Sequence, residues 1–155
     1  KQDDLVGRVS FYQGDDVLTI YTTEVTDTDI YHCEASNQDQ YAGGVTIGDQ
    51  TKLDVHIQPS INPPIPATLL SFDGSSLAVP CAFTGNPEPT PRWCRVDSSG
   101  RCIADNPTCT GPSVTQESSQ SLVLSFATLH LCNTGRYACR VKNGIGSVES
   151  IFALT

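Results

Sequence analysis

Seven cysteines are the residues of this chain best suited to chemistry, since thiols can form disulfides, bind zinc or act as nucleophiles. None of them forms the Cys-x-x-Cys pair typical of structural zinc sites. So many cysteines are unusual in a reducing cytosol, and the count favours a disulfide framework, one thiol left over and an extracellular location. The seven are Cys33, Cys81, Cys94, Cys102, Cys109, Cys132 and Cys139.

Other residues that could do chemistry do not form a recognisable active site. His32 and His56 fall on two predicted neighbouring strands and could lie side by side, which we interpret as a surface pair rather than a metal site. The acidic pairs at 3–4 and 15–16 lack the ligand spacing of a calcium loop. A serine elbow, a P-loop and an H-E-x-x-H motif are absent from the sequence. We therefore expect no enzyme activity, no metal site and no cofactor.

Charge is distributed unevenly along the chain. The formal net charge is −8, and residues 1–59 carry eleven acidic against three basic side chains, whereas residues 60–155 carry six of each. An acidic front half argues against nucleic acid and anionic membrane as binding partners. No apolar run reaches the roughly eighteen residues of a membrane span. We expect a protein ligand or a second copy of the chain, as in a homodimer, and no direct membrane contact by this segment.

Short strands rather than helices are predicted to position these residues. Leu77, Val79, Cys81 and Phe83 alternate with polar or small residues, which is typical of a half-buried strand. The same alternation recurs at 122–126 and at 137–141, and the many Ser, Thr, Gly and Pro residues favour turns. In the front half the predicted strands cover residues 7–11, 17–21, 27–33 and 47–55.

A tyrosine two positions before a cysteine occurs twice, in DTDIYHC at 27–33 and NTGRYAC at 133–139. This pattern resembles the tyrosine corner of immunoglobulin-type β-sandwiches, in which the hydroxyl returns to the backbone upstream. The resemblance implies that Tyr31 and Tyr137 are core residues of two tandem Greek-key sandwiches. The first copy comes too early in the chain to be preceded by a full set of strands, so we expect that domain to be incomplete.

The back half carries the fuller resemblance. Its spacing Cys81…Trp93…Cys139 matches an immunoglobulin sandwich whose inter-sheet disulfide packs against a tryptophan. The segments C-x-F-T-G-N-P-E-P-T-P-x-W and GRYACRVKNGIG are similar to the I-set type found in adhesion molecules and receptors. The resemblance implies an I-set-like domain over residues 59–155 and a bond between Cys81 and Cys139.

Four further cysteines of the back half have three pairings open to them. Cys94 follows the inward Trp93 and should point out of the sheet, and the turn at 97–100 could bring Cys102 opposite it. We favour Cys94 with Cys102, which leaves Cys109 for Cys132. Cys33 then has no partner.

The front half resembles part of a variable-type immunoglobulin domain. GRVSF, VLTI and DTDIYHC are similar to its strands D, E and F, and IGDQTKLDV is similar to its strand G. The resemblance implies an ion pair between Arg8 and Asp27 and a partial domain over residues 1–58. In the back half Asn133 stands where the corner aspartate is expected, so no such pair is predicted there.

Two other segments bear on organisation and binding. Four prolines between residues 59 and 66 predict a stiff joint that leads into the back domain. In the front half the loop from 36 to 46 corresponds to the usual recognition loop between strands F and G. One tyrosine among polar residues suits protein binding, although an ordinary solvent loop has a similar composition. Its candidate contact residues are Asn37, Gln38, Asp39, Gln40 and Tyr41.

The resemblance implies a non-catalytic, extracellular recognition module. The order of domains is similar to that of junctional-adhesion-type molecules, which predicts the ectodomain of a membrane protein that binds partners through sheet faces and the F–G loop. The ligand-binding ectodomain of a receptor tyrosine kinase is one alternative. A secreted soluble defence protein is another, and fold-level analogy does not separate the three.

Overall fold

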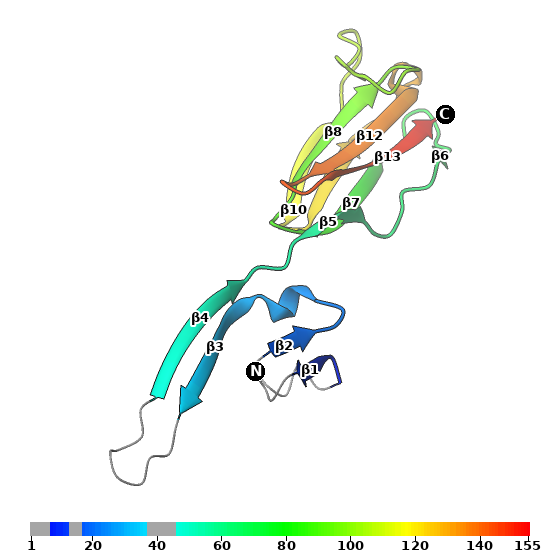
Figure 1. Cartoon of the computed structure of the whole chain (residues 1–155). Coiled ribbons are helices and arrows are strands. Elements are labelled where there is room, and N and C mark those ends of the chain that lie inside the picture. The colour runs from blue at the N-terminus through cyan, green and yellow to red at the C-terminus, as the bar shows by residue number, and fades with distance from the viewer. Residues whose placement is uncertain (1–6, 13–16, 37–45) are drawn as a thin grey trace, which may run out of the picture. The chain divides into compact units, whose positions relative to one another are not determined.

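The prediction of an all-β fold is confirmed by the computed structural model, which describes residues 7–12, 17–36 and 46–155 (Figure 1). Across these residues the regular elements are β-strands and two short 3₁₀ turns. The chain divides into two compact units, residues 1–56 and 57–155. We call them the front unit and the back unit.

The front unit consists of two antiparallel hairpins. Strand β1 (Val9–Tyr12) pairs with β2 (Val17–Ile20), and β3 (Asp29–Ser36) pairs with β4 (Thr46–Leu53). A single 3₁₀ turn, η2 (Val25–Asp27), leads into β3. The β3–β4 ladder is regular over all eight residues of each strand, which gives this hairpin a well-defined register.

The back unit is a sandwich of two sheets, visible in Figure 1. One sheet has the strand order β10-β11-β7-β5 and the other the order β6-β13-β12-β8-β9. A second 3₁₀ turn, η3 (Leu131–Asn133), precedes β12. The strands are β5 (Ile57–Ile61), β6 (Thr68–Leu69), β7 (Leu77–Asn86), β8 (Thr90–Val96), β9 (Cys102–Ile103), β10 (Ser113–Ser118), β11 (Ser121–Phe126), β12 (Gly135–Lys142) and β13 (Ser147–Leu154).

Alternation along the strands builds the core of the back unit. Because successive side chains point to opposite faces, every second residue of β7, β11 and β12 enters the space between the sheets. The Trp93 indole donates to the Leu122 carbonyl at 2.9 Å and meets the Phe152 ring edge-on at 5.9 Å. Tyr137 stacks on Phe152 with ring centroids 5.6 Å apart. The buried apolar side chains thus converge on an aromatic group that includes Trp93, the tryptophan of the Cys81…Trp93…Cys139 spacing.

The predicted proline-rich joint is misplaced. The prolines belong to the back unit, where Pro59 is a buried residue of β5 and β5 pairs with β7. After Ile61 the chain crosses to the other sheet and joins it through β6, which runs parallel to β13. Proline has no N–H to leave unpaired, so a proline-rich run suits a segment that changes sheets.

Candidate interaction surfaces

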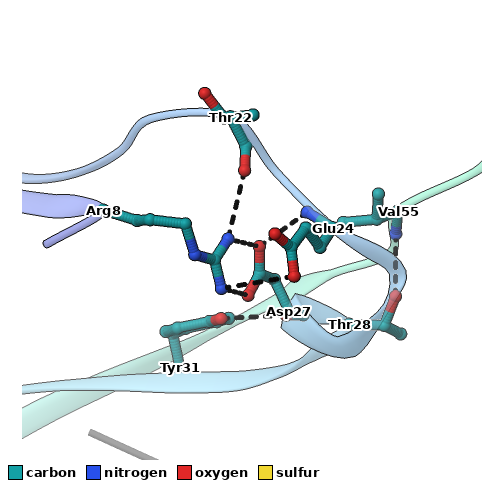
Figure 2. Close-up of polar contacts among 7 residues, drawn as sticks. All are labelled: Arg8, Thr22, Glu24, Asp27, Thr28, Tyr31 and Val55. Carbon is teal, nitrogen blue, oxygen red and sulfur yellow. Dashed lines mark hydrogen bonds and ion pairs between the residues drawn. The ribbon is translucent and has the colours of Figure 1, made fainter. Parts of the chain in front are cut away.

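A bidentate ion pair stabilises the tyrosine corner of the front unit (Figure 2). The Arg8 guanidinium donates to both carboxylate oxygens of Asp27, at 2.7 and 2.8 Å, and to the Thr22 carbonyl at 3.1 Å. The hydrogen bond to Asp27 is the largest cause of a raised Arg8 pKa. Asp27 is only 3% exposed and also accepts the Glu24 backbone N–H at 2.7 Å. The residue before β1 is therefore tied to the turn before β3.

Two further contacts bring the second hairpin into this corner. The Tyr31 hydroxyl of β3 donates to the Asp27 carbonyl at 2.8 Å, and the Val55 N–H donates to the Thr28 hydroxyl at 2.9 Å (Figure 2). Thus Asp27 and Thr28 of one short turn connect the residue before β1, strand β3 and the segment after β4. Polar contacts rather than a large apolar core join the two hairpins at this point.

The corner of the back unit has the same tyrosine bond but a different anchor. The buried Tyr137 hydroxyl donates to the Asn133 carbonyl at 2.8 Å, and burial raises the pKa of Tyr137. The Asn133 side chain accepts the His130 N–H at 2.8 Å and donates to the Thr110 carbonyl at 3.0 Å. The amide therefore holds the loop that precedes β10, a role that sequence reasoning missed.

Three disulfides fasten the back unit. Cys81 bonds Cys139 across the two sheets, and both are fully buried, with a Cα separation of 6.5 Å. Two more bonds lie away from this core, with Cα separations of 5.6 and 5.9 Å; they join Cys94 to Cys102 and Cys109 to Cys132. The second of them closes the loop that Asn133 also holds, so this edge is doubly anchored.

Cys33 is free and exposed on β3. It lies at the rim of a hollow in the front unit that is also lined by Phe11, Leu18 and Tyr31. Phe11 is 53% and Leu18 42% exposed, whereas Cys139, at the same offset from its corner tyrosine, is fully buried. The front unit therefore presents apolar side chains and a thiol on a surface whose counterpart is a closed core in the back unit.

The predicted histidine pair is wrong. His32 lies opposite Gln50 in the β3–β4 ladder. His56 follows the end of β4, and its Nε2 lies 3.6 Å from an Asp54 carboxylate oxygen. Within residues 7–12, 17–36 and 46–155, no group of three or more His, Cys, Asp or Glu side chains could hold a metal ion. The candidate loop residues 37–41 lie outside the described residues.

A basic surface on the back unit was not predicted. Arg136, Arg140 and Lys142 alternate along β12 with the buried Tyr137, Cys139 and Val141, so they point out of the sandwich. On β8, Arg92 precedes the buried Trp93 and is exposed. The signal was available, since the alternation that identified the core face of β12 also places basic residues on its outer face.

The immunoglobulin I-set domain model matches residues 59–155. The chain belongs to the immunoglobulin superfamily. Human hemicentin-1 is 28% identical over 98% of this chain, and cell adhesion molecule 4 of Xenopus laevis is 32% identical over 83% of it. The chain spans 2% and 29% of the lengths of these two relatives. The immunoglobulin sandwich is thus homologous to parts of cell adhesion molecules.

Solved structures show the same fold. The insect immune protein hemolin matches 96% of this chain with a TM-score of 0.65 and 21% identity, over 34% of its own chain. The I67–I69 fragment of titin matches 96% of this chain with a TM-score of 0.59 and 21% identity, over 49% of its own chain. Both likenesses support the immunoglobulin fold. None of the helices in the described part of the chain is long and apolar enough to cross a bilayer.

Proposed function

We propose that this chain is a non-catalytic, extracellular recognition module of a cell-surface adhesion molecule or receptor, and that it binds protein partners. The observation that carries the proposal is its similarity to adhesion molecules, which extends over 83–98% of the chain and so includes both units. The front unit is taken to be part of a variable-type domain, as its strand motifs suggest.

The architecture suits binding through surfaces. Three disulfides and a buried aromatic core stabilise the back unit, so its sheet faces can be presented with little conformational entropy to lose on binding. Arginines on the outer face of β12 and β8 supply donors of the kind enriched in protein interfaces. The front F–G loop with Tyr41 would form a second contact.

The receptor tyrosine kinase and soluble defence alternatives share the same module and differ in the other domains of the parent protein. The hemolin likeness, at 21% identity, supports the fold and favours neither alternative. The named relatives include adhesion molecules such as fasciclin-2 of Schistocerca americana and neuroglian of Drosophila melanogaster. This similarity favours the adhesion function.

Bead binding tests the proposal. Beads coated with the chain should adhere to intact cells or to one another, whereas beads coated with reduced, unfolded chain should not. Absence of both kinds of adhesion would contradict the proposal. In the same assay Tyr41→Ala should weaken adhesion, and unchanged adhesion would remove the F–G loop from the binding surface.

A further inference from the structure

Basic side chains of the back unit are concentrated on the outer face of one sheet. In the β8–β12 ladder Arg140 lies directly opposite Arg92, and Lys142 lies one outward position further along β12. Arg136 occupies the other end of the same face, and Arg101 follows the turn between β8 and β9. Residues 60–155 contain six basic side chains, and five of them lie on or beside this surface. We call it the basic face.

Two carboxylates lie close to the basic face and neutralise it only in part. Glu149 is opposite Arg140 on β13 and pairs with it. Asp97 lies near Arg136, but its carboxylate is engaged by Ser99 and the Arg101 N–H within its own turn, and these hydrogen bonds lower its pKa. Positive charge thus remains available on the surface.

Individual contacts show which cations are free to bind. Arg136 donates to the carbonyls of residues 97 and 98 at 3.4 and 3.3 Å, and its charge helps to lower the pKa of the nearby Asp97 carboxylate. Arg92 and Lys142 are exposed, and neither makes a side-chain hydrogen bond or ion pair with the described residues of the chain. Arg140, directly opposite Arg92, is paired with Glu149 and donates to the Gly100 carbonyl, so Arg92 and Lys142, rather than Arg140, are available to an anionic partner.

The middle of the basic face is apolar but largely covered, since Ala138 is fully buried and Ile151 is partly buried. Ala138 and Ile151 are cross-strand neighbours between the charged positions, and Cys94 with its disulfide lies on the other side of Ala138. Arginine is enriched in protein interfaces. Arginine also binds carboxylates through two parallel hydrogen bonds, which gives such a face geometric preference for acidic side chains.

The front unit has the complementary charge. It contributes the whole net charge of −8, and its exposed Glu34 and Asp49, on opposite faces of the β3–β4 hairpin, form no ion pair among the described residues. Two front units would repel each other, whereas a front unit and a basic face attract at distances within a Debye length of about 8 Å. We propose that the basic face of one copy binds the acidic front unit of a second copy.

This inference rests on the proposed recognition function and names its partner. If the pair is two-fold symmetric, each copy supplies one front unit and one basic face, so the contact forms twice. A linear sulfated polysaccharide would meet the same cations, but it offers nothing to the acidic front unit. A second copy uses both charged surfaces, and for this reason we favour it.

Sedimentation velocity of the intact chain at low and high salt provides the first test. The chain should self-associate at about 100 μM, and the association should weaken as salt screens the charges. Arg92→Gln with Lys142→Gln should weaken the dimer by about tenfold or more. Thr115→Glu with Ser119→Glu makes the same change in net charge on the β10–β11 hairpin, which belongs to the other sheet, and should leave the dimer unchanged. A monomeric chain, or equal effects of the two double variants, would overturn the proposal.

A charge swap gives the sharper test. Arg92→Glu with Lys142→Glu makes the basic face acidic, and Glu34→Lys with Asp49→Lys makes the front unit less acidic. Each variant alone should be monomeric, and their equimolar mixture should recover dimers, because the unchanged front unit of the first variant then meets the unchanged basic face of the second. Circular dichroism of each variant controls for folding.

Further outcomes distinguish a failure of the proposed pairing from a failure of the recognition function. Failure of the folded variants to recover dimers on mixing would overturn the pairing of the two surfaces. A monomeric chain retained by immobilised heparin at about 0.15 M salt would assign the basic face to a polysaccharide and would also overturn the pairing. Coated beads that adhere to cells without clustering would leave the recognition function standing while the self-pairing fails.

Discussion

Arg8 and Asp27 make two hydrogen-bonded contacts, at 2.7 and 2.8 Å, in a corner where the back unit has Asn133 instead of an aspartate. Asp27 and Asn133 each cap their own 3₁₀ turn through a side-chain oxygen, but their second partners differ. Asp27 faces a guanidinium, and Asn133 faces the Thr110 carbonyl. The two corners are therefore alike in backbone and different in chemistry, so exchanging their residues should damage both.

Asp27→Asn should loosen the front unit. An amide keeps an acceptor for the Glu24 N–H but removes the negative charge and one of the oxygens that bind Arg8. Backbone amides around β1 and the start of β3 should exchange about tenfold faster or more. Hydrogen exchange with mass spectrometry would measure this, with peptides of the back unit as the internal control. Unchanged protection would contradict a stabilising role for the ion pair.

Asn133→Asp should destabilise the back unit, although it restores the residue that the family pattern leads one to expect. The carboxylate cannot donate to the Thr110 carbonyl, and the site is 2% exposed. We expect a loss of about 1–3 kcal/mol in the free energy of unfolding. Denaturation followed by the fluorescence of Trp93, the single tryptophan, would report it.

The matched control for that change is Asn106→Asp. Its side-chain oxygen only accepts, from the Thr108 N–H and hydroxyl, so a carboxylate keeps both bonds. This variant should unfold at the same denaturant concentration as the parent chain. An equal loss in both variants would show that added negative charge, rather than the missing donor, is responsible.

Stability should fall at alkaline pH because of Tyr137. Burial raises its pKa above the value of about 10 of an unfolded tyrosine, so the fold favours the neutral phenol. The stability that Tyr137 contributes is fully present below about pH 10 and is lost as the pH rises through the pKa of Tyr137 in the folded state. Unfolding free energies measured between about pH 7 and 11 should show this decline.

Tyr137→Phe should flatten that alkaline decline. At neutral pH the variant should be less stable by about 0.5–1.5 kcal/mol, because it lacks the hydrogen bond to the Asn133 carbonyl. Tyr31→Phe serves as the control, since Tyr31 belongs to the front unit and Trp93 reports on the back unit. A decline that persists in Tyr137→Phe would assign it to another group.

The disulfides should contribute unequally. The Cys81–Cys139 bond spans 58 positions and the Cys94–Cys102 bond spans 8, so the chain-entropy estimate is about 4 against 2.5 kcal/mol. Replacing the first pair by alanine should therefore destabilise the back unit more than replacing the second pair by alanine. Urea denaturation would compare them, and an equal or larger loss from the second pair would contradict the estimate.

Local pattern carried the sequence analysis as far as the all-β fold and the superfamily. Alternation with period two identifies the core face of a strand because it is set by backbone geometry within one element. The offset from Tyr137 to Cys139 indicated the corner through its resemblance to immunoglobulin domains. The Cys81…Trp93…Cys139 spacing likewise implied a core tryptophan, through its resemblance to immunoglobulin sandwiches. Such features need no knowledge of which strand lies beside which.

Features that depend on which strands pair could not be predicted from such local patterns. The histidine prediction failed because the β3–β4 register places Gln50 opposite His32, and register is set by inter-strand hydrogen bonds. The proline-rich run was assigned to a joint because its composition cannot distinguish a linker from a strand that changes sheets. Both errors concern neighbours in space rather than local conformation.

The basic face shows the division most clearly. The sequence by itself determined that Arg136, Arg140 and Lys142 point away from the core, since they alternate with buried residues along one strand. Only the tertiary structure decided that Arg92 lies directly beside Arg140, because pairing of β8 with β12 joins positions 48 residues apart. Charged residues that lie far apart in the sequence thereby form one surface, to which a partner can bind.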